Sequence, residues 1–155
     1  MEKVRIESKE KKVFLLVGSS DWGKTETLKN SFFAGRNLHI VIDGVKLKIR
    51  TRSNCDVEKE FNDAIDKFKN EKYLILAFSS SKHKPEKYLN KLKSYGFKFY
   101  AFVLESKYRN PQEIIPKDEI DMLKQYGVVE VYNKKVEANV RAADFKEFIR
   151  KNLPW

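Results

Sequence analysis

Mostly apolar runs alternate along the chain with segments in which apolar residues recur at helical spacing. The apolar runs occupy residues 12–17, 73–78, 97–104 and 128–132. The helical segments occupy residues 24–33, 57–68, 85–95, 120–126 and 140–153. Continuous apolar runs are typical of strands that helices cover on both faces, and strand–helix alternation favours a parallel sheet. The pattern therefore predicts an α/β fold, with a three-layer α/β/α arrangement around a mostly parallel sheet.

One pair of strands departs from this rule. The runs 38–42 and 45–49 alternate apolar and polar residues, and only Asp43 and Gly44 separate them. An Asp-Gly pair between alternating runs is the strongest short-range signal for a β-hairpin. We therefore expect one antiparallel hairpin strand within the otherwise parallel sheet.

Two stretches carry neither pattern. Residues 2–12 are charged, with Val4 and Ile6 in alternation, and form either a short edge strand or a frayed arm. Residues 105–116 are polar, contain Pro111 and Pro116, and are expected to form a loop. No linker or shift in composition interrupts the chain, so residues 1–155 are expected to form a single domain.

Charge and composition limit the partners and the cellular compartment that we expect for the chain. The chain has 32 Lys and Arg against 22 Asp and Glu, for a net charge of +10. A positive field attracts polyanions, so a nucleic-acid or protein partner on the basic surface is one expectation; lysines scattered over solvated helix faces are the other. The lone Cys55 has no partner for a disulfide and no Cys/His cluster for zinc. No apolar run spans a bilayer and no signal-peptide core is present, which favours a cytoplasmic protein.

The first strand leads into the most specific motif of the chain. Residues 18–25 read Gly-Ser-Ser-Asp-Trp-Gly-Lys-Thr and fill G-x-x-x-x-G-K-[ST] at every fixed position. An apolar run precedes the motif and a helical segment follows it, which is the setting that gives the motif meaning. Gly18 and Gly23 let the backbone curl closely around a phosphate, and the following helix adds unpaired N–H groups.

The motif assigns roles to its side chains. Lys24 is expected to reach the β- and γ-phosphates, and the Thr25 hydroxyl is expected to ligate Mg²⁺. Lys24 and Thr25 are therefore the expected catalytic residues, and the expected cofactor is Mg²⁺ with ATP or GTP. The expected nucleotide-binding residues are Gly18, Ser19, Ser20, Asp21, Trp22, Gly23, Lys24, Thr25 and Glu26.

Together, the motif and the element order resemble the P-loop NTPase superfamily. Within that superfamily the order is most similar to the small GTPases, which also place a β-hairpin after the first helix. The small GTPases end the third strand with D-x-x-G, whose aspartate helps to hold Mg²⁺, and here residues 49–54 contain neither acid nor glycine. Their guanine-reading N-K-x-D is replaced by Ser-Lys-Tyr-Arg at 106–109, where only Lys107 fits and the base-selecting aspartate is absent. Asn133 and Lys134 occupy the region of the family's S-A-K motif, where the resemblance would place Lys134 beside a base, although a single lysine is a weak signal.

A Walker B acid is harder to place. Asp21 lies inside the loop, Asp43 ends an apolar run and Asp56 follows a basic stretch, but a local turn, a hairpin turn and a helix cap explain them equally well or better. Cations that would stabilise developing charge are Arg36, Arg50 and Arg52. The sequence thus predicts a nucleoside-triphosphate-binding protein, an atypical NTPase whose hydrolysis is weak or depends on a partner. The alternatives are a non-enzymatic basic binding module and a small kinase using Asp43 or Asp21.

Overall fold

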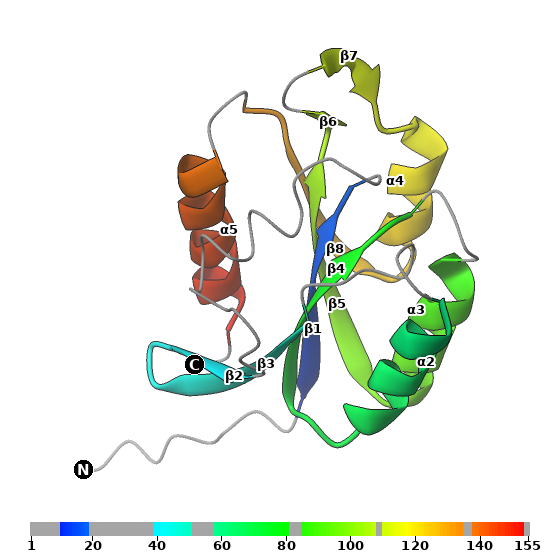
Figure 1. Ribbon diagram of the computed structural model, residues 1–155, viewed down its shortest axis with the longest axis vertical. Coiled ribbons are helices and arrows are strands. Elements are labelled where there is room, and N and C mark those ends of the chain that lie inside the picture. The colour runs from blue at the N-terminus through cyan, green and yellow to red at the C-terminus, as the bar shows by residue number, and fades with distance from the viewer. Residues whose placement is uncertain are drawn as a thin grey trace.

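The computed structural model describes residues 10–18, 39–50, 58–80, 85–107, 110–134 and 138–153. These residues form a six-stranded sheet with the order β2-β3-β4-β1-β5-β8 (Figure 1). Its strands are β1 (Lys11–Val17), β2 (His39–Ile42), β3 (Val45–Arg50), β4 (Tyr73–Phe78), β5 (Phe97–Leu104) and β8 (Gly127–Tyr132). All neighbouring strands are parallel except β2 and β3, which confirms the predicted mostly parallel sheet with one antiparallel pair.

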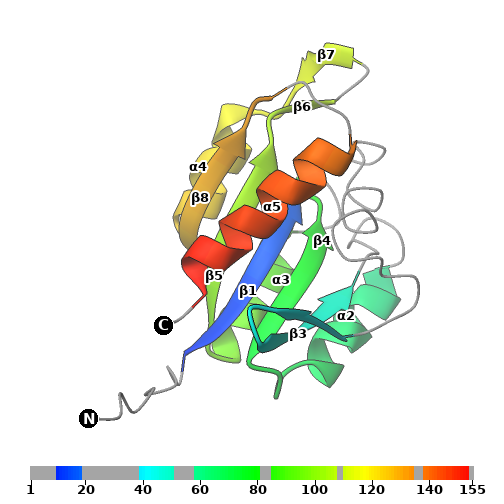
Figure 2. The same cartoon turned by 90° about the vertical axis from the view of Figure 1, so that its left-hand side faces the viewer.

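The central strands are buried on both faces, as their apolar runs predict. Every residue of β1 from Val13 to Val17 is fully buried, and so is nearly all of β4. Covering both faces requires helices on both sides of the sheet. The helices α2 (Glu58–Lys67), α3 (Pro85–Ser94) and α4 (Lys117–Lys124) lie on one face, and α5 (Ala138–Asn152) lies on the other (Figures 1 and 2). The three-layer α/β/α arrangement is therefore confirmed.

Aromatic side chains join the helices to the sheet. On the α2 face, the ring of Phe61 lies 6.2 Å from that of Phe78 on β4 and meets Tyr88 of α3 edge-on at 4.9 Å. On the α5 face, the ring of Phe102 on β5 lies 5.4 Å from that of Phe145. Such pairs bury large apolar areas and add a preference for particular ring geometry, so they fix how each helix packs.

The predicted hairpin is present between β2 and β3. Asp43 and Gly44 have φ values of +50° and +81°, which is the two-residue pattern of a type I′ turn. Because β3 runs parallel to β4, the turn before β3 lies at the amino edge of the sheet. The carboxyl edge, where β1 and β4 end, is on the opposite side of the molecule (Figure 1).

The segment predicted as a loop at 105–116 contains a second, small sheet. Its strands are β6 (Ser106–Lys107) and β7 (Asn110–Ile114), which pair antiparallel. The prediction failed because prolines were taken as evidence against strands, whereas a two-stranded ribbon has free edges where a missing N–H is tolerated. Pro116 does act as a boundary, since it is the N-cap of α4.

None of the helices in the described part of the chain combines the length and apolar character that crossing a membrane requires. Among the described residues, no group of three or more His, Cys, Asp and Glu side chains is arranged to hold a metal ion.

Candidate functional site

The end of β1 places the start of the sequence motif in the middle of the sheet. Gly18 directly follows Val17, and its N–H donates to the carbonyl oxygen of Phe78 at 3.1 Å. This bond extends the pairing of β1 with β4 by one step beyond the register of Val17 with Phe78. On its other side β1 pairs with β5. The chain therefore leaves the sheet at Gly18 from a fully buried central strand.

The connections around β1 explain why this edge is suited to a ligand. The chain after β1 continues to β2 at one end of the sheet, whereas the chain after β5 continues to β8 at the other end. Connections that diverge in this way open a crevice outside the carboxyl ends of the strands, and ligands of open α/β sheets bind there.

Most residues of the predicted nucleotide site lie outside the described residues. Gly18 is described, and the remaining members at 19–26, among them the catalytic and metal-binding Lys24 and Thr25, are not. Asp56, Arg36 and Arg52 also fall outside. Their roles therefore stay predictions, and the described structure fixes only where the motif begins.

Asp43 does not belong to this site. It lies in the β2–β3 turn at the amino edge of the sheet, opposite to Gly18. Its Oδ1 lies 3.5 Å from Nε of Arg150 near the end of α5. From the sequence, Asp43 was either a hairpin residue or a Walker B acid, and the turn geometry supports the hairpin interpretation. This position gives no support to a role for Asp43 at the carboxyl edge, where Gly18 lies.

Arg50 ends β3 at the carboxyl edge but lies one strand away from β1. The strand β4 is inserted between β3 and β1, so the end of β3 does not adjoin Gly18. The guanidinium carbon of Arg50 lies 5.8 Å from the ring centre of Phe61 on α2. The resemblance to small GTPases assigned the magnesium-binding aspartate to the end of the third strand, and here that position is both basic and displaced.

Two buried serines directly follow Phe78, the hydrogen-bond partner of Gly18. Ser79 is fully buried and Ser80 is 5% exposed. The Ser80 hydroxyl donates to Oε1 of Glu119, in the first turn of α4, at 2.9 Å. Glu119 is 39 residues further along the chain than Ser80. No local pattern connects the two.

The environment of Glu119 alters its acidity. Its side chain is half-buried, and this burial raises the pKa of the carboxyl group. The nearby charge of Asp118 acts in the same direction, while the hydrogen bond from Ser80 acts against it. A carboxylate with a raised pKa holds a proton more readily, which is a property of proton-accepting groups in active sites as well as of some structural acids.

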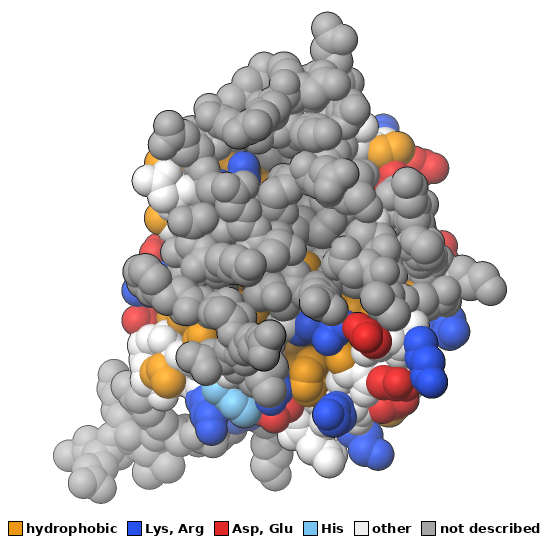
Figure 3. All heavy atoms as spheres, in the orientation of Figure 1, with side chains coloured by type: hydrophobic (Ala, Val, Ile, Leu, Met, Phe, Trp, Pro, Cys, Tyr) orange, Lys and Arg blue, Asp and Glu red, His pale blue; other side chains and the backbone are white. Residues whose placement is uncertain are grey.

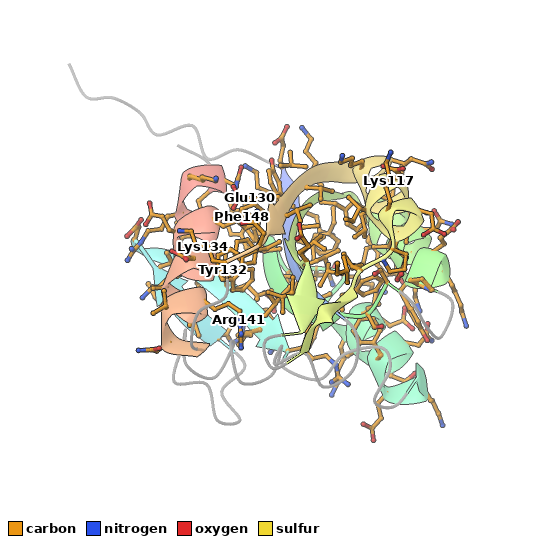
Figure 4. The ribbon with its side chains drawn as sticks, turned by 90° about the horizontal axis from the view of Figure 1, so that it is seen from above. Lys117, Glu130, Tyr132, Lys134, Arg141 and Phe148 are labelled. Atoms are coloured by element: carbon orange, nitrogen blue, oxygen red, sulfur yellow. The ribbon has the colours of Figure 1, made fainter. Side chains whose placement is uncertain are left out.

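A groove of about 360 Å³ lies between β8 and α5, near the carboxyl end of the sheet. Figure 4 shows Glu130, Tyr132, Lys134 and Phe148 gathered there. The Tyr132 hydroxyl donates to Oδ2 of Asp144 at 2.6 Å, and Nζ of Lys134 lies 3.7 Å from the same oxygen. Burial, followed by the bond to Asp144, raises the pKa of Tyr132. Lys134, which the sequence placed beside a base, is thus paired with an acid of α5.

The charged surface is mixed on the face that Figure 3 shows. In the lower part of that face, around α2, Lys and Arg side chains lie among Asp and Glu side chains. An example is the pair formed by Lys91 and Asp66, whose Nζ and Oδ1 atoms are 2.8 Å apart. This arrangement is typical of solvated helix faces. The expectation of a polyanionic partner is therefore supported by the net charge and not by a basic patch on this face.

Comparison with solved structures identifies similar folds among designed proteins. One is a de novo designed protein described as a PLOOP2X3_50 fold, solved by solution NMR; it is 14% identical, the match covers 92% of each chain, and the TM-score is 0.53. Another is a de novo designed protein with a P-loop NTPase fold, also solved by NMR, with 17% identity, coverage of 90% of this chain and 91% of the other, and a TM-score of 0.47. No protein-family model and no curated protein matches the chain. At this identity the first likeness concerns the fold alone: the chain has an α/β fold of the P-loop NTPase type.

Proposed function

We propose that the chain binds a nucleoside triphosphate, ATP or GTP together with Mg²⁺, at residues 18–25. One observation carries the proposal. The motif starts at the last paired residue of a buried central strand, where the N–H of Gly18 is bonded to Phe78 at the carboxyl edge of the sheet. A phosphate-binding loop requires such a strand before it, and a chance match to the motif would not.

The donor set of the motif fits this ligand. Backbone N–H groups and the Lys24 ammonium are hydrogen-bond donors to phosphate oxygens, and the Thr25 hydroxyl is an oxygen ligand of the kind that Mg²⁺ takes alongside phosphates. When bound, Mg²⁺ would neutralise charge on the β- and γ-phosphates. The chain's own part would be to orient the phosphates at the carboxyl edge of the sheet, where Gly18 follows β1.

Slow or partner-dependent turnover is part of the proposal. Phosphoryl transfer depends on positioning and on neutralising charge, so the absence of an acid where β3 ends removes a strong contribution. Arg50 occupies that end and packs on Phe61 instead. A partner that supplied a cation or an acid would raise the rate.

Isothermal titration calorimetry tests the binding step. Wild-type protein is titrated with ATP and with GTP, each in the presence and absence of Mg²⁺. Lys24→Ala is expected to weaken binding by about tenfold or more, because a charge-assisted contact to phosphate contributes about 1.5–3 kcal/mol. Lys46→Ala is the matched control, since Lys46 is exposed on β3. Wild-type binding of neither nucleotide would refute the proposal.

A non-enzymatic module that binds nucleic acid is the second candidate, favoured by the net charge of +10. It predicts binding of DNA or RNA that weakens steeply with salt and is the same for wild type and Lys24→Ala. The kinase alternative loses Asp43 as a candidate and retains Asp21 alone.

A further inference from the structure

The hydrogen bond between Ser80 and Glu119 joins segments that follow β4 and β5, the two strands beside β1. Ser80 follows β4, and Glu119 belongs to α4, which connects β5 to β8. The strand β1 lies between β4 and β5. The bond therefore joins segments that follow the two strands beside β1, and Gly18 directly follows β1 itself. The strands β4, β1 and β5 lie side by side in the sheet (Figures 1 and 2).

The pair is built into the fold. Ser80 is 5% exposed, and its neighbour Ser79 is fully buried. The Ser80 hydroxyl holds Oε1 of Glu119 at 2.9 Å, and no described residue donates a hydrogen bond to the other carboxylate oxygen. One carboxylate oxygen of Glu119 is thus held by a residue that follows β4, which fixes the orientation of the carboxylate.

We infer that Glu119 is the carboxylate that accepts the proton of the water attacking the γ-phosphate, and that Ser80 is its positioning residue. This inference rests on the proposed function. The water oxygen forms a bond to the γ-phosphorus while the bond from that phosphorus to the bridging oxygen breaks. The electron pair of the broken bond leaves with the nucleoside diphosphate. The water proton passes to Glu119 and then to solvent.

The location of Glu119 compensates for the missing acid of β3. The two acids that the sequence considered outside the loop were Asp43, now at the opposite edge, and Asp56, which lies outside the described residues. Glu119 belongs to α4, which follows β5 on the other side of β1 from β3. Its half-burial also makes the carboxylate a stronger proton acceptor than an exposed one.

A turnover assay on Glu119→Gln tests the inference, because glutamine preserves the shape and the bond from Ser80 but cannot take a proton. The kcat for nucleotide hydrolysis is expected to fall by about 10²–10⁴-fold, while the Kd for the Mg²⁺–nucleotide changes by less than about threefold. Two carboxylates serve as controls and should keep wild-type kcat. Glu105→Gln removes an acid at the end of β5, and Asp121→Asn removes an exposed acid of α4.

Ser80→Ala tests whether the bond between Ser80 and Glu119 positions Glu119 for catalysis or only holds α4 against the segment after β4. The bond from Ser80 lowers the pKa of Glu119, so its loss should move the acidic limb of the kcat–pH profile to higher pH. Asp118, on the same helix, is the charged residue that affects the pKa of Glu119, and the variant leaves Asp118 in place. A tether alone would lower the melting temperature without moving that limb. Ser80→Ala also provides the test if Glu119→Gln does not fold.

The outcomes distinguish this inference from the proposed function. If wild-type protein binds neither nucleotide, the proposed function fails. If wild type binds nucleotide and Glu119→Gln turns over at the wild-type rate, or wild type shows no turnover, the role of Glu119 is overturned while binding stands. Loss of turnover in Glu105→Gln with Glu119→Gln unaffected would also overturn it.

Discussion

Replacing Gly127 by alanine should destabilise the protein through a collision with backbone. A Cβ added at Gly127 would lie 2.2 Å from the carbonyl oxygen of Phe99, its partner in the β5–β8 register. Cβ atoms essentially never approach so closely, and reaching 3.0 Å requires a shift of at least 0.8 Å. Because the obstacle is backbone, a rotamer change cannot relieve it, and β8 must move away from β5.

The clash forces a local shift of the backbone, and the cost of such a shift is about 1–3 kcal/mol. With a urea m-value of about 2 kcal/mol/M, the unfolding midpoint should fall by about 0.5–1.5 M. Urea unfolding followed by circular dichroism measures it. Gly44→Ala is the control, since nothing lies within 4 Å of its added Cβ and only its φ of +81° opposes the change. An unchanged midpoint for Gly127→Ala would refute the argument.

Two further predictions concern the packing of α5 and the ion pairs of α2. Phe102→Ala should lower the free energy of unfolding by about 3–5 kcal/mol in the same urea experiment, because it empties the centre of an aromatic cluster. The rings around it are those of Tyr132, Phe145 and Phe148, at 4.8, 5.4 and 5.3 Å. Hydrogen bonds from Lys91 and Tyr95 lower the pKa of Asp66, so its stabilising contribution is present above the unfolded-state pKa and is lost as pH falls through the folded-state value. Asp66→Asn should therefore flatten the decline in stability at acidic pH, measured by thermal unfolding across pH 2–6; a decline as steep as that of wild type would count against the assignment.

The elements of the fold could be predicted because burial leaves a local trace. A strand covered on both faces has to be apolar throughout, and β1 and β4 are. The turn at Asp43 and Gly44 is equally local, since its backbone conformation selects those residue types. The order of the strands in the sheet could not be predicted from local patterns. The insertion of β4 between β3 and β1 depends on packing between distant segments, and the sequence of β4 does not indicate which strands lie beside it.

In the candidate site, too, contiguous features could be predicted and contacts between distant segments could not. The phosphate-loop motif is contiguous, so its position after β1 could be predicted, and Gly18 is found where that prediction requires. The Ser80–Glu119 pair joins residues from two elements, and its burial and hydrogen bond exist only in the folded chain. Asp43 was a candidate acid from its sequence position alone, because an acid that follows an apolar run looks the same at either edge of the sheet. In the structure it lies at the amino edge, away from Gly18.

The most direct test of the account is calorimetric titration of the wild-type chain and of Lys24→Ala with ATP and GTP in the presence of Mg²⁺. The account predicts saturable binding of at least one of the two nucleotides to wild type, and a loss of about tenfold or more in affinity for Lys24→Ala. Equal affinity of the two proteins for the nucleotide, or no binding to wild type, would contradict it.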